Sequence, residues 1–169
     1  LFLSLDETNK TNEKVKVLVD YLLAVSDEDK INMLALFTVR KPKRQINSTQ
    51  LKNWAMELTQ IPEWLFKESY DVVGDLAETI SLLLPPPKHE QNKTLSHWIL
   101  EIKGIASFDE AEKKDWLLNS WDSLAQQEKF VFNKILTGGF RVGVSQSLVI
   151  KAIAQISGLE ATVLTHRIM

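Results

Sequence analysis

Four basic side chains gather in one short loop of this 169-residue chain and are its clearest candidates for chemistry. The loop reads Arg40-Lys41-Pro42-Lys43-Arg44, so a proline separates two pairs of cations. Such a cluster suits the neutralisation of phosphates, and the release of condensed counterions makes this kind of binding strongly dependent on salt. We therefore expect these four cations to contact a nucleic acid. The alternative is an ordinary solvated loop.

A second loop, at residues 137–145, combines three glycines with a single arginine, Arg141. Glycine has no side chain, so backbone N–H groups there can approach a ligand closely, and the helix expected to begin at Ser145 offers its N-terminus to a phosphate. Arg141 would then reach a phosphate or the minor groove of a duplex. The alternative is a plain glycine-rich turn. The residues of this loop expected to contact nucleic acid are Thr137, Gly138, Gly139, Arg141, Gly143 and Ser145.

Residue sets typical of catalysis or metal binding are missing from the sequence. The histidines His89, His97 and His166 are far apart, none has a neighbouring ligand at metal spacing, and the chain contains no cysteine. No Gly-Lys-Ser or Gly-Lys-Thr follows the glycine-rich loop, which argues against a nucleotide-cradling loop. We therefore predict no catalytic residue, no metal ion and no cofactor in this chain.

Composition sets the broad class of the protein. With 44% hydrophobic and 25% charged residues, the chain falls among ordinary globular proteins. Its formal net charge of −2 means that nucleic-acid binding has to depend on local clusters of cations. The longest apolar run, at residues 80–84, is too short for a membrane span, and the absence of cysteine fits a reducing compartment. We expect a cytoplasmic protein that makes no membrane contact.

Apolar residues recur at three- and four-residue spacing along nearly the whole chain, which predicts amphipathic helices. No segment alternates strictly between apolar and polar residues, so no strand is expected. Thr94 and Gly158 are expected helix caps. The expected helices span residues 15–23, 26–40, 48–58, 72–80, 94–102, 107–121, 130–135 and 145–156, with another beginning near Pro62. The tryptophans expected to pack in the core are Trp54, Trp64, Trp98, Trp116 and Trp121.

A run of three prolines from Pro85 ends the helical pattern of the first part of the chain. The proline-rich, polar residues 85–93 lack periodicity and are interpreted as a linker. The apolar pattern of residues 46–65 returns in residues 144–163 at a constant offset of 98. The repeat predicts an all-α fold with two pseudo-symmetric helical halves, the alternative being chance agreement between amphipathic helices. The predicted domain covers residues 1–169, with halves at about 1–84 and 94–169.

The second loop carries the most specific family resemblance of the chain. Its sequence, Leu136-Thr137-Gly138-Gly139-Phe140-Arg141-Val142-Gly143-Val144-Ser145, resembles the N-terminal DNA-binding domain of ATP-dependent DNA ligases, most closely the bacterial form. The resemblance covers nearly the whole chain. It extends to Arg40-Lys41-Pro42-Lys43-Arg44, Ile61-Pro62-Glu63-Trp64-Leu65-Phe66, Val73-Gly74-Asp75-Leu76-Ala77-Glu78-Thr79 and Thr165-His166-Arg167-Ile168-Met169.

In that family the domain is helical, has two pseudo-symmetric halves and contacts the minor groove of duplex DNA on both sides of a nick. The resemblance implies contacts from residues 40–44 and 137–145, with Arg141 as the main anchor and nicked double-stranded DNA as the partner. Family ligases attach AMP to the lysine of a Lys-x-Asp-Gly motif and use ATP and Mg²⁺. Since that motif is absent here, the resemblance implies a chain that is inactive alone, with nucleotidyltransferase and OB-fold domains beyond Met169.

The resemblance also implies a monomer that acts at the bacterial nucleoid in DNA repair, replication or recombination. Two features depart from the family pattern: the net charge of −2 is low for a clamp, and Val39 stands where the second loop has Gly138. Two other classes stay open, a helical protein-interaction adaptor and a helix-turn-helix regulator that reads the major groove with the helix after Ser145. Duplex binding without sequence preference separates the ligase domain from both.

Overall fold

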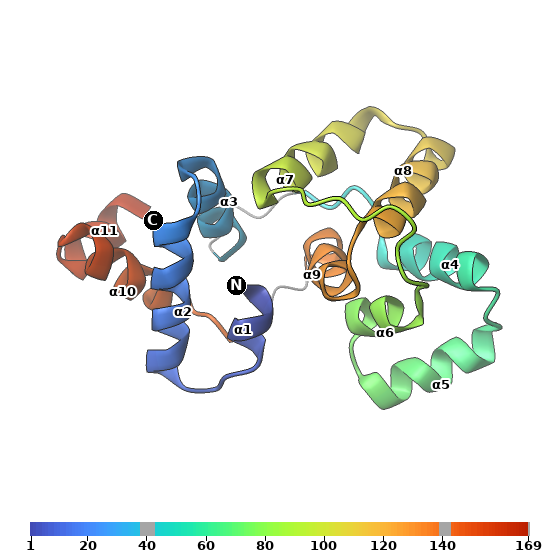
Figure 1. Ribbon diagram of the computed structural model, residues 1–169, viewed down its shortest axis with the longest axis horizontal. Helices are drawn as coiled ribbons and strands as arrows, with labels where there is room; N and C mark the ends of the chain where they lie inside the picture. Colours follow the sequence, from blue (N-terminus) through green and yellow to red (C-terminus); the bar gives the residue numbers. More distant parts are fainter. Residues whose placement is uncertain (38–42, 139–142, 169) are drawn as a thin grey trace. The chain divides into compact units, whose positions relative to one another are not determined.

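Helices make up the regular secondary structure of the computed structural model, which describes residues 1–37, 43–138 and 143–168 (Figure 1). Within these ranges there are eleven α-helices, one short 3₁₀ helix and no strand. The all-helical fold predicted from the apolar periodicity is thereby confirmed. The elements are α1 (Phe2–Asp6), α2 (Thr11–Ala24), α3 (Asp27–Phe37), α4 (Ser48–Thr59), α5 (Glu63–Val73), α6 (Leu76–Leu83), α7 (Leu95–Gly104), η1 (Ile105–Ser107), α8 (Glu110–Ser123), α9 (Gln126–Thr137), α10 (Gln146–Ser157) and α11 (Ala161–Ile168).

The helices group into two compact units. Unit 1 consists of α1 to α3, α10 and α11, and unit 2 consists of α4 to α9 with η1. The chain passes from unit 1 to unit 2 after residue 41 and returns after residue 139, so both passages fall in the two loops singled out from the sequence. The units therefore differ from the expected halves at about 1–84 and 94–169. The pseudo-symmetry of those halves remains a prediction.

The proline-rich residues 85–93, expected to form a linker, lie inside unit 2 instead. The backbone N–H of Lys88 donates a hydrogen bond of 3.2 Å to the Asp122 carboxylate. The backbone N–H of Gln91 donates one of 2.8 Å to the Ser123 carbonyl. The prolines do end the preceding helix, as predicted, but the polar segment after them is fastened to the end of α8. We call residues 85–93 the strap.

The core of unit 1 forms where α2 packs along α10. Leu18 and Leu22 of α2 and Val149 of α10 are almost completely buried. Lys14 lies one turn before Leu18 on the same face and is buried as well. Leu23, the last residue of the helix predicted over 15–23, is exposed because the packed face of α2 follows steps of four residues from Lys14 to Leu22.

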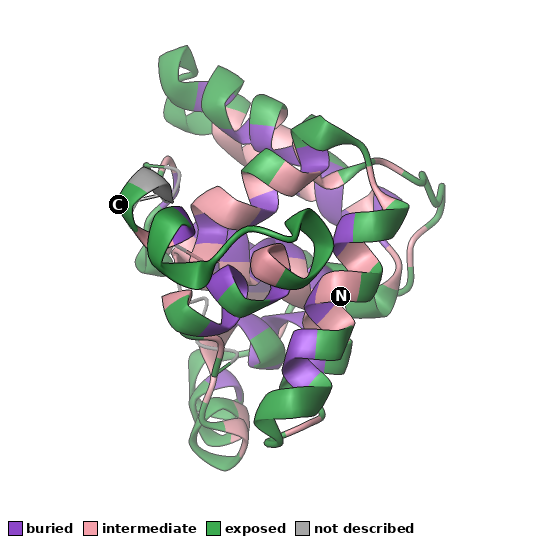
Figure 2. Ribbon diagram, turned by 90° about the vertical axis from the view of Figure 1, so that its left-hand side faces the viewer, coloured by how far each residue is buried: buried purple, intermediate pink, exposed green. Residues whose placement is uncertain are grey.

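The centre of unit 2 forms where α6 packs against α9. Asn133 is completely buried there, and its side-chain oxygen accepts a hydrogen bond of 2.8 Å from the Trp121 indole N–H. Nearby, the Trp98 ring meets the Phe132 ring edge-on, with 5.0 Å between the centroids. Figure 2 shows how individual helices carry buried positions on one side and exposed positions on the other, as their amphipathic sequences predict.

Helix ends follow the sequence signals in part. Thr94 caps α7 with its side chain, and Gly158 ends α10 in the left-handed conformation, both as predicted. The single helix predicted over residues 72–80 is wrong, because Gly74 ends α5 with a φ of +76° and α6 begins after it.

Trp64, expected in the core, is 66% exposed. Periodicity predicts which residues share a helix face, but it leaves open which face is packed.

Candidate nucleic-acid interface

The described ends of the two loops meet in unit 2, where Arg44 lies against Gly138. Gly138 caps α9 in the left-handed conformation with a φ of +66°, which favours glycine. A Cβ atom built on Gly138 would lie 2.9 Å from Nε and 3.2 Å from Nη2 of Arg44. Gly138 therefore has two roles: it ends the helix and leaves room for the guanidinium at the start of the second loop.

Helix α4 fixes the end of the first loop. Ile46 is buried in unit 2, and Asn47 caps α4 through reciprocal hydrogen bonds of 2.8 and 3.1 Å with Gln50. The two cations just before these anchors, Lys43 and Arg44, are exposed. Both charges therefore lie just before the N-terminus of α4, whose position is fixed by these contacts. The helix dipole also favours an anion there.

Two polar residues at the end of α9 are already engaged within unit 2. The Thr137 hydroxyl donates a hydrogen bond of 2.9 Å to the Asn133 carbonyl oxygen. The Lys134 ammonium forms an ion pair with the Asp75 carboxylate. The Thr137 hydroxyl hydrogen is thus used within α9, and Lys134 connects α9 to the start of α6.

The far end of the second loop belongs to unit 1, where α2 holds it. The Lys14 ammonium donates a hydrogen bond of 3.2 Å to the Gly143 carbonyl oxygen. Gly143 is left-handed, with a φ of +61°, and a Cβ atom on it would lie 2.6 Å from the Lys14 Nζ. A larger residue would displace the ammonium, so Gly143 and Lys14 together set where the chain enters α10.

Helix α10 begins directly after Ser145, as predicted. Ser145 is the N-cap residue, but its hydroxyl lies 2.7 Å from the Ser147 hydroxyl instead of capping the helix. Both serines are exposed. The helix dipole favours an anion at such a terminus. One of the two hydroxyls donates to the other, and the second keeps its hydrogen for a ligand.

Six of the residues expected to contact nucleic acid fall within the described ranges: Lys43, Arg44, Thr137 and Gly138 in unit 2, and Gly143 and Ser145 in unit 1. The other four lie outside the described residues: Arg40, Lys41, Gly139 and Arg141. Lys14 is a residue that the sequence analysis missed. Its signal is the four-residue spacing to Leu18 and Leu22, which places a lysine on a buried helix face.

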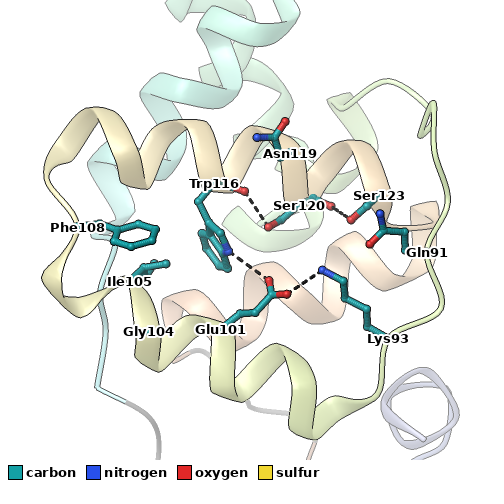
Figure 3. Close-up of a pocket in the computed structure, with 10 residues that line it drawn as sticks. All are labelled: Gln91, Lys93, Glu101, Gly104, Ile105, Phe108, Trp116, Asn119, Ser120 and Ser123. Atoms are coloured by element: carbon teal, nitrogen blue, oxygen red, sulfur yellow. Dashed lines mark hydrogen bonds and ion pairs between the residues drawn. The ribbon is translucent and has the colours of Figure 1, made fainter.

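A hollow of about 520 Å³ beside α7, α8 and the strap is a second candidate site (Figure 3). The Glu101 carboxylate there accepts hydrogen bonds of 2.8 Å from Lys93 and from His97, and one of 3.2 Å from the Trp116 indole. Partial burial raises the pKa of Glu101, but these hydrogen bonds and the Lys93 charge outweigh it and hold that pKa below its ordinary value. Since the charges of Lys93 and Glu101 balance, we interpret the cluster as a structural link between α7 and α8.

Metal-ligand clusters are absent from the described part of the chain, where no three His, Cys, Asp or Glu side chains gather. Over those same residues, no helix combines the length and the apolar character needed to cross a membrane.

A protein-family model described as the DNA ligase N terminus matches residues 1–154. The match includes both loops, all helices of unit 2, α1 to α3 and most of α10. The end of α10 and all of α11 lie beyond it. No curated protein sequence matches the chain.

Proposed function

Because the chain belongs to the DNA ligase N-terminal family, we propose that it is the non-catalytic DNA-binding domain of an ATP-dependent DNA ligase and that it grips duplex DNA around a nick. The resemblance to the DNA ligase N-terminal domain is confirmed for residues 1–154, while its extension to residues 165–169 and its bacterial form remain predictions. In this proposal nicked double-stranded DNA is the partner. ATP and Mg²⁺ serve the catalytic domains of the full ligase, which acts in repair, replication or recombination.

The contact between Arg44 and Gly138 is the observation that carries the proposal. It brings a cation of the first loop against the backbone of the second, so both loops can meet neighbouring phosphates of one DNA strand. A guanidinium presents a planar fork of donors that suits phosphate oxygens. Lys43, exposed beside it, adds a second positive charge.

The start of α10 supplies a further contact in the proposal. Ser145 and Ser147 present hydroxyls at a helix N-terminus, where a phosphate is favoured. Lys14 holds Gly143 just before them and so limits the freedom of the loop end. Arg141, two residues earlier in the sequence, is proposed to reach the minor groove as the main anchor.

Binding of this kind depends on phosphates and on groove shape, so it should show little preference for sequence. A ligase has to seal nicks in any sequence, which fits such a mode. The formal net charge of −2 predicts modest affinity that falls steeply with salt.

The test is fluorescence anisotropy with nicked and intact duplexes of two unrelated sequences over a range of salt concentrations. The parent chain should bind both nicked sequences equally well. Arg44→Ala should bind about tenfold more weakly at low salt and lower the salt slope by about 1. Lys103→Ala is the matched control, because Lys103 is an exposed cation of unit 2 outside both loops. It should leave affinity and slope nearly unchanged.

Three results would count against the proposal. Strong preference for one of the two sequences would favour a helix-turn-helix regulator, and no binding to either would favour a protein-interaction adaptor. Equal losses in Arg44→Ala and Lys103→Ala would show that general charge, rather than the meeting point of the two loops, determines the binding.

A further inference from the structure

Helices α5 and α6 lie side by side in unit 2 and border a groove of about 430 Å³ (Figure 1). Val72 and Val73 of α5 face Leu82 and Leu83 of α6 across it. The lining also includes the buried Thr79 and, at one edge, Glu68. We call these residues the α5–α6 groove.

The sides of the α5–α6 groove expose apolar side chains to an unusual degree. Val72 is 86% exposed and Leu82 is 61% exposed. Phe66 is the buried side chain of α5, so that helix is attached to unit 2 mainly through one aromatic ring. Contiguous exposed apolar surface on a folded protein is typical of a protein contact.

Uncompensated carboxylates surround the α5–α6 groove. Residues 63–83 contain five carboxylates and one lysine, Lys67. Two of the five form ion pairs with lysines of other elements. The remaining three, Glu68, Asp71 and Glu78, are exposed and form no ion pair with the described residues.

Glu68 lines the groove, and the other two carboxylates lie on the same two helices, outside its lining. Asp71 lies one turn from Glu68 on α5, and Glu78 lies one turn before Leu82 on α6. The surface is therefore an apolar channel with Glu68 in its lining and two further carboxylates near it on the same helices. Phosphates of a nucleic acid or of an anionic membrane would be repelled there.

We propose that the α5–α6 groove binds an amphipathic, basic helix of a partner protein. Apolar side chains of that helix, repeated at three- and four-residue spacing, fill the space between Val72 and Leu82. Its lysines and arginines lie over Glu68, Asp71 and Glu78, so charge complementarity selects the partner. This inference goes beyond the DNA contact proposed above and does not depend on it.

The exposed sides of the groove can be altered without removing the core beneath them. Thr79 and Phe66, both buried, attach α6 and α5 to unit 2, whereas Val72 and Leu82 are mainly in contact with solvent. The double variant Val72→Ser/Leu82→Ser should therefore fold, which its circular dichroism spectrum and melting temperature would verify.

The test uses a fluorescein-labelled leucine–lysine helix of about 15 residues, roughly four turns, as the probe. Its anisotropy should report saturable binding to the full chain. Val72→Ser/Leu82→Ser should weaken that binding by at least about tenfold. The matched control Leu23→Ser/Ile31→Ser removes two comparably exposed apolar side chains from unit 1 and should bind like the parent.

The charge part of the proposal has its own variants. Glu68→Gln/Asp71→Asn should weaken binding and reduce its dependence on salt, whereas Asp20→Asn/Glu28→Gln, at exposed positions of unit 1, should do neither. A leucine–glutamate version of the peptide should not bind.

Several results would overturn the inference. These are no binding of the leucine–lysine helix, equal binding of both peptides, or equal affinity of the parent and Val72→Ser/Leu82→Ser. Sedimentation would show whether the parent chain dimerises and whether Val72→Ser/Leu82→Ser abolishes the dimer. That result would identify a second copy of the chain as the occupant and would also overturn the inference. Duplex binding measured on the same samples keeps this result separate from the DNA proposal, since all four variants should retain it.

Discussion

The Lys14 ammonium donates a hydrogen bond to the carbonyl oxygen of Gly143, a residue 129 positions further along the chain. Lys14 is buried on the face of α2 that packs along α10, so its ammonium group contacts the protein itself and is not available to a ligand. The bond fixes the last glycine of the loop, two residues before Ser145. A buried lysine thus positions the candidate interface without being part of its surface.

Replacing Lys14 by Met should therefore affect both stability and DNA binding. Methionine keeps the apolar stem but leaves the Gly143 carbonyl without this donor, which should cost about 1–2 kcal/mol in urea unfolding. Nicked-duplex affinity should fall by about threefold or more, since the loop end gains freedom. Lys16→Met, at an exposed position of the same helix, is the control. Lower stability with unchanged affinity would remove Lys14 from the positioning of the loop.

Gly138→Ala should weaken duplex binding, whereas Gly158→Ala should not. Both glycines cap helices with similar left-handed φ angles, +66° and +68°, so both variants carry backbone strain of about 1–3 kcal/mol. Only at Gly138 would the new Cβ also collide with Arg44, as nothing lies within 4 Å at Gly158. Thermal melts should show similar destabilisation of the two variants, and a selective loss of duplex affinity in Gly138→Ala would report the Arg44 contact. Equal duplex affinities of the two variants would refute it.

Glu101→Gln should change how stability depends on pH. Hydrogen bonds from Lys93, His97 and Trp116 keep the pKa of Glu101 below its ordinary value of 4.5. Its carboxylate therefore stabilises the fold above the unfolded-state pKa, and this contribution is lost as the pH falls through the folded-state pKa. Near neutral pH the variant should be less stable by about 1–2 kcal/mol.

The difference between the parent and Glu101→Gln should shrink as urea unfolding is repeated toward acid pH. Glu110→Gln, at an exposed position of α8, is the matched control and should show only a small difference from the parent. If the difference in free energy of unfolding between the parent and Glu101→Gln stayed constant with pH, the Glu101 side chain would act through its shape and not through its charge.

Arg141→Ala should weaken binding to nicked duplex and lower the salt slope by about 1, because one cation that displaces counterions from the DNA is lost. Anisotropy titrations at several salt concentrations measure both quantities. An unchanged slope would remove Arg141 from the proposed contacts, whatever the effect of Arg44→Ala.

The chain incubated with ATP and Mg²⁺ should form no covalent AMP adduct, because no Lys-x-Asp-Gly motif is present in the sequence. Intact-mass spectrometry would detect such an adduct directly. Finding one would overturn the non-catalytic assignment and would call for a search for the modified lysine.

Local features of the fold could be predicted from the sequence, and distant pairings could not. Thr94 and Gly158 mark helix ends because caps depend on a few neighbouring residues. The packing of α2 on α10 joins segments separated by more than a hundred residues, and no local pattern encodes it. The strap illustrates the same limit, since a polar, proline-rich stretch is compatible both with a linker and with a segment bonded to α8.

The candidate interface was predictable to a similar extent. Charge density and glycine content indicated Lys43, Arg44 and Gly138, because these signals are carried by residue type. That Arg44 lies on Gly138 follows from the packing of α4 and α9 within unit 2 and is visible only in three dimensions. Lys14 escaped notice because a lysine in an apolar stripe is usually interpreted as lying at the solvent edge of the helix.

The two passages of the chain between the units also determine the order of folding during synthesis. Unit 2 is a continuous stretch inserted between the two parts of unit 1, so its sequence is complete before α10 has been translated. Until then α2 lacks α10 as a packing partner, and its closure onto α10 is a contact of high sequence separation, which forms slowly. Unit 2 should therefore fold on the ribosome before α10 and α11 have been translated. At that stage α1, α2 and α3 still lack these two helices as packing partners.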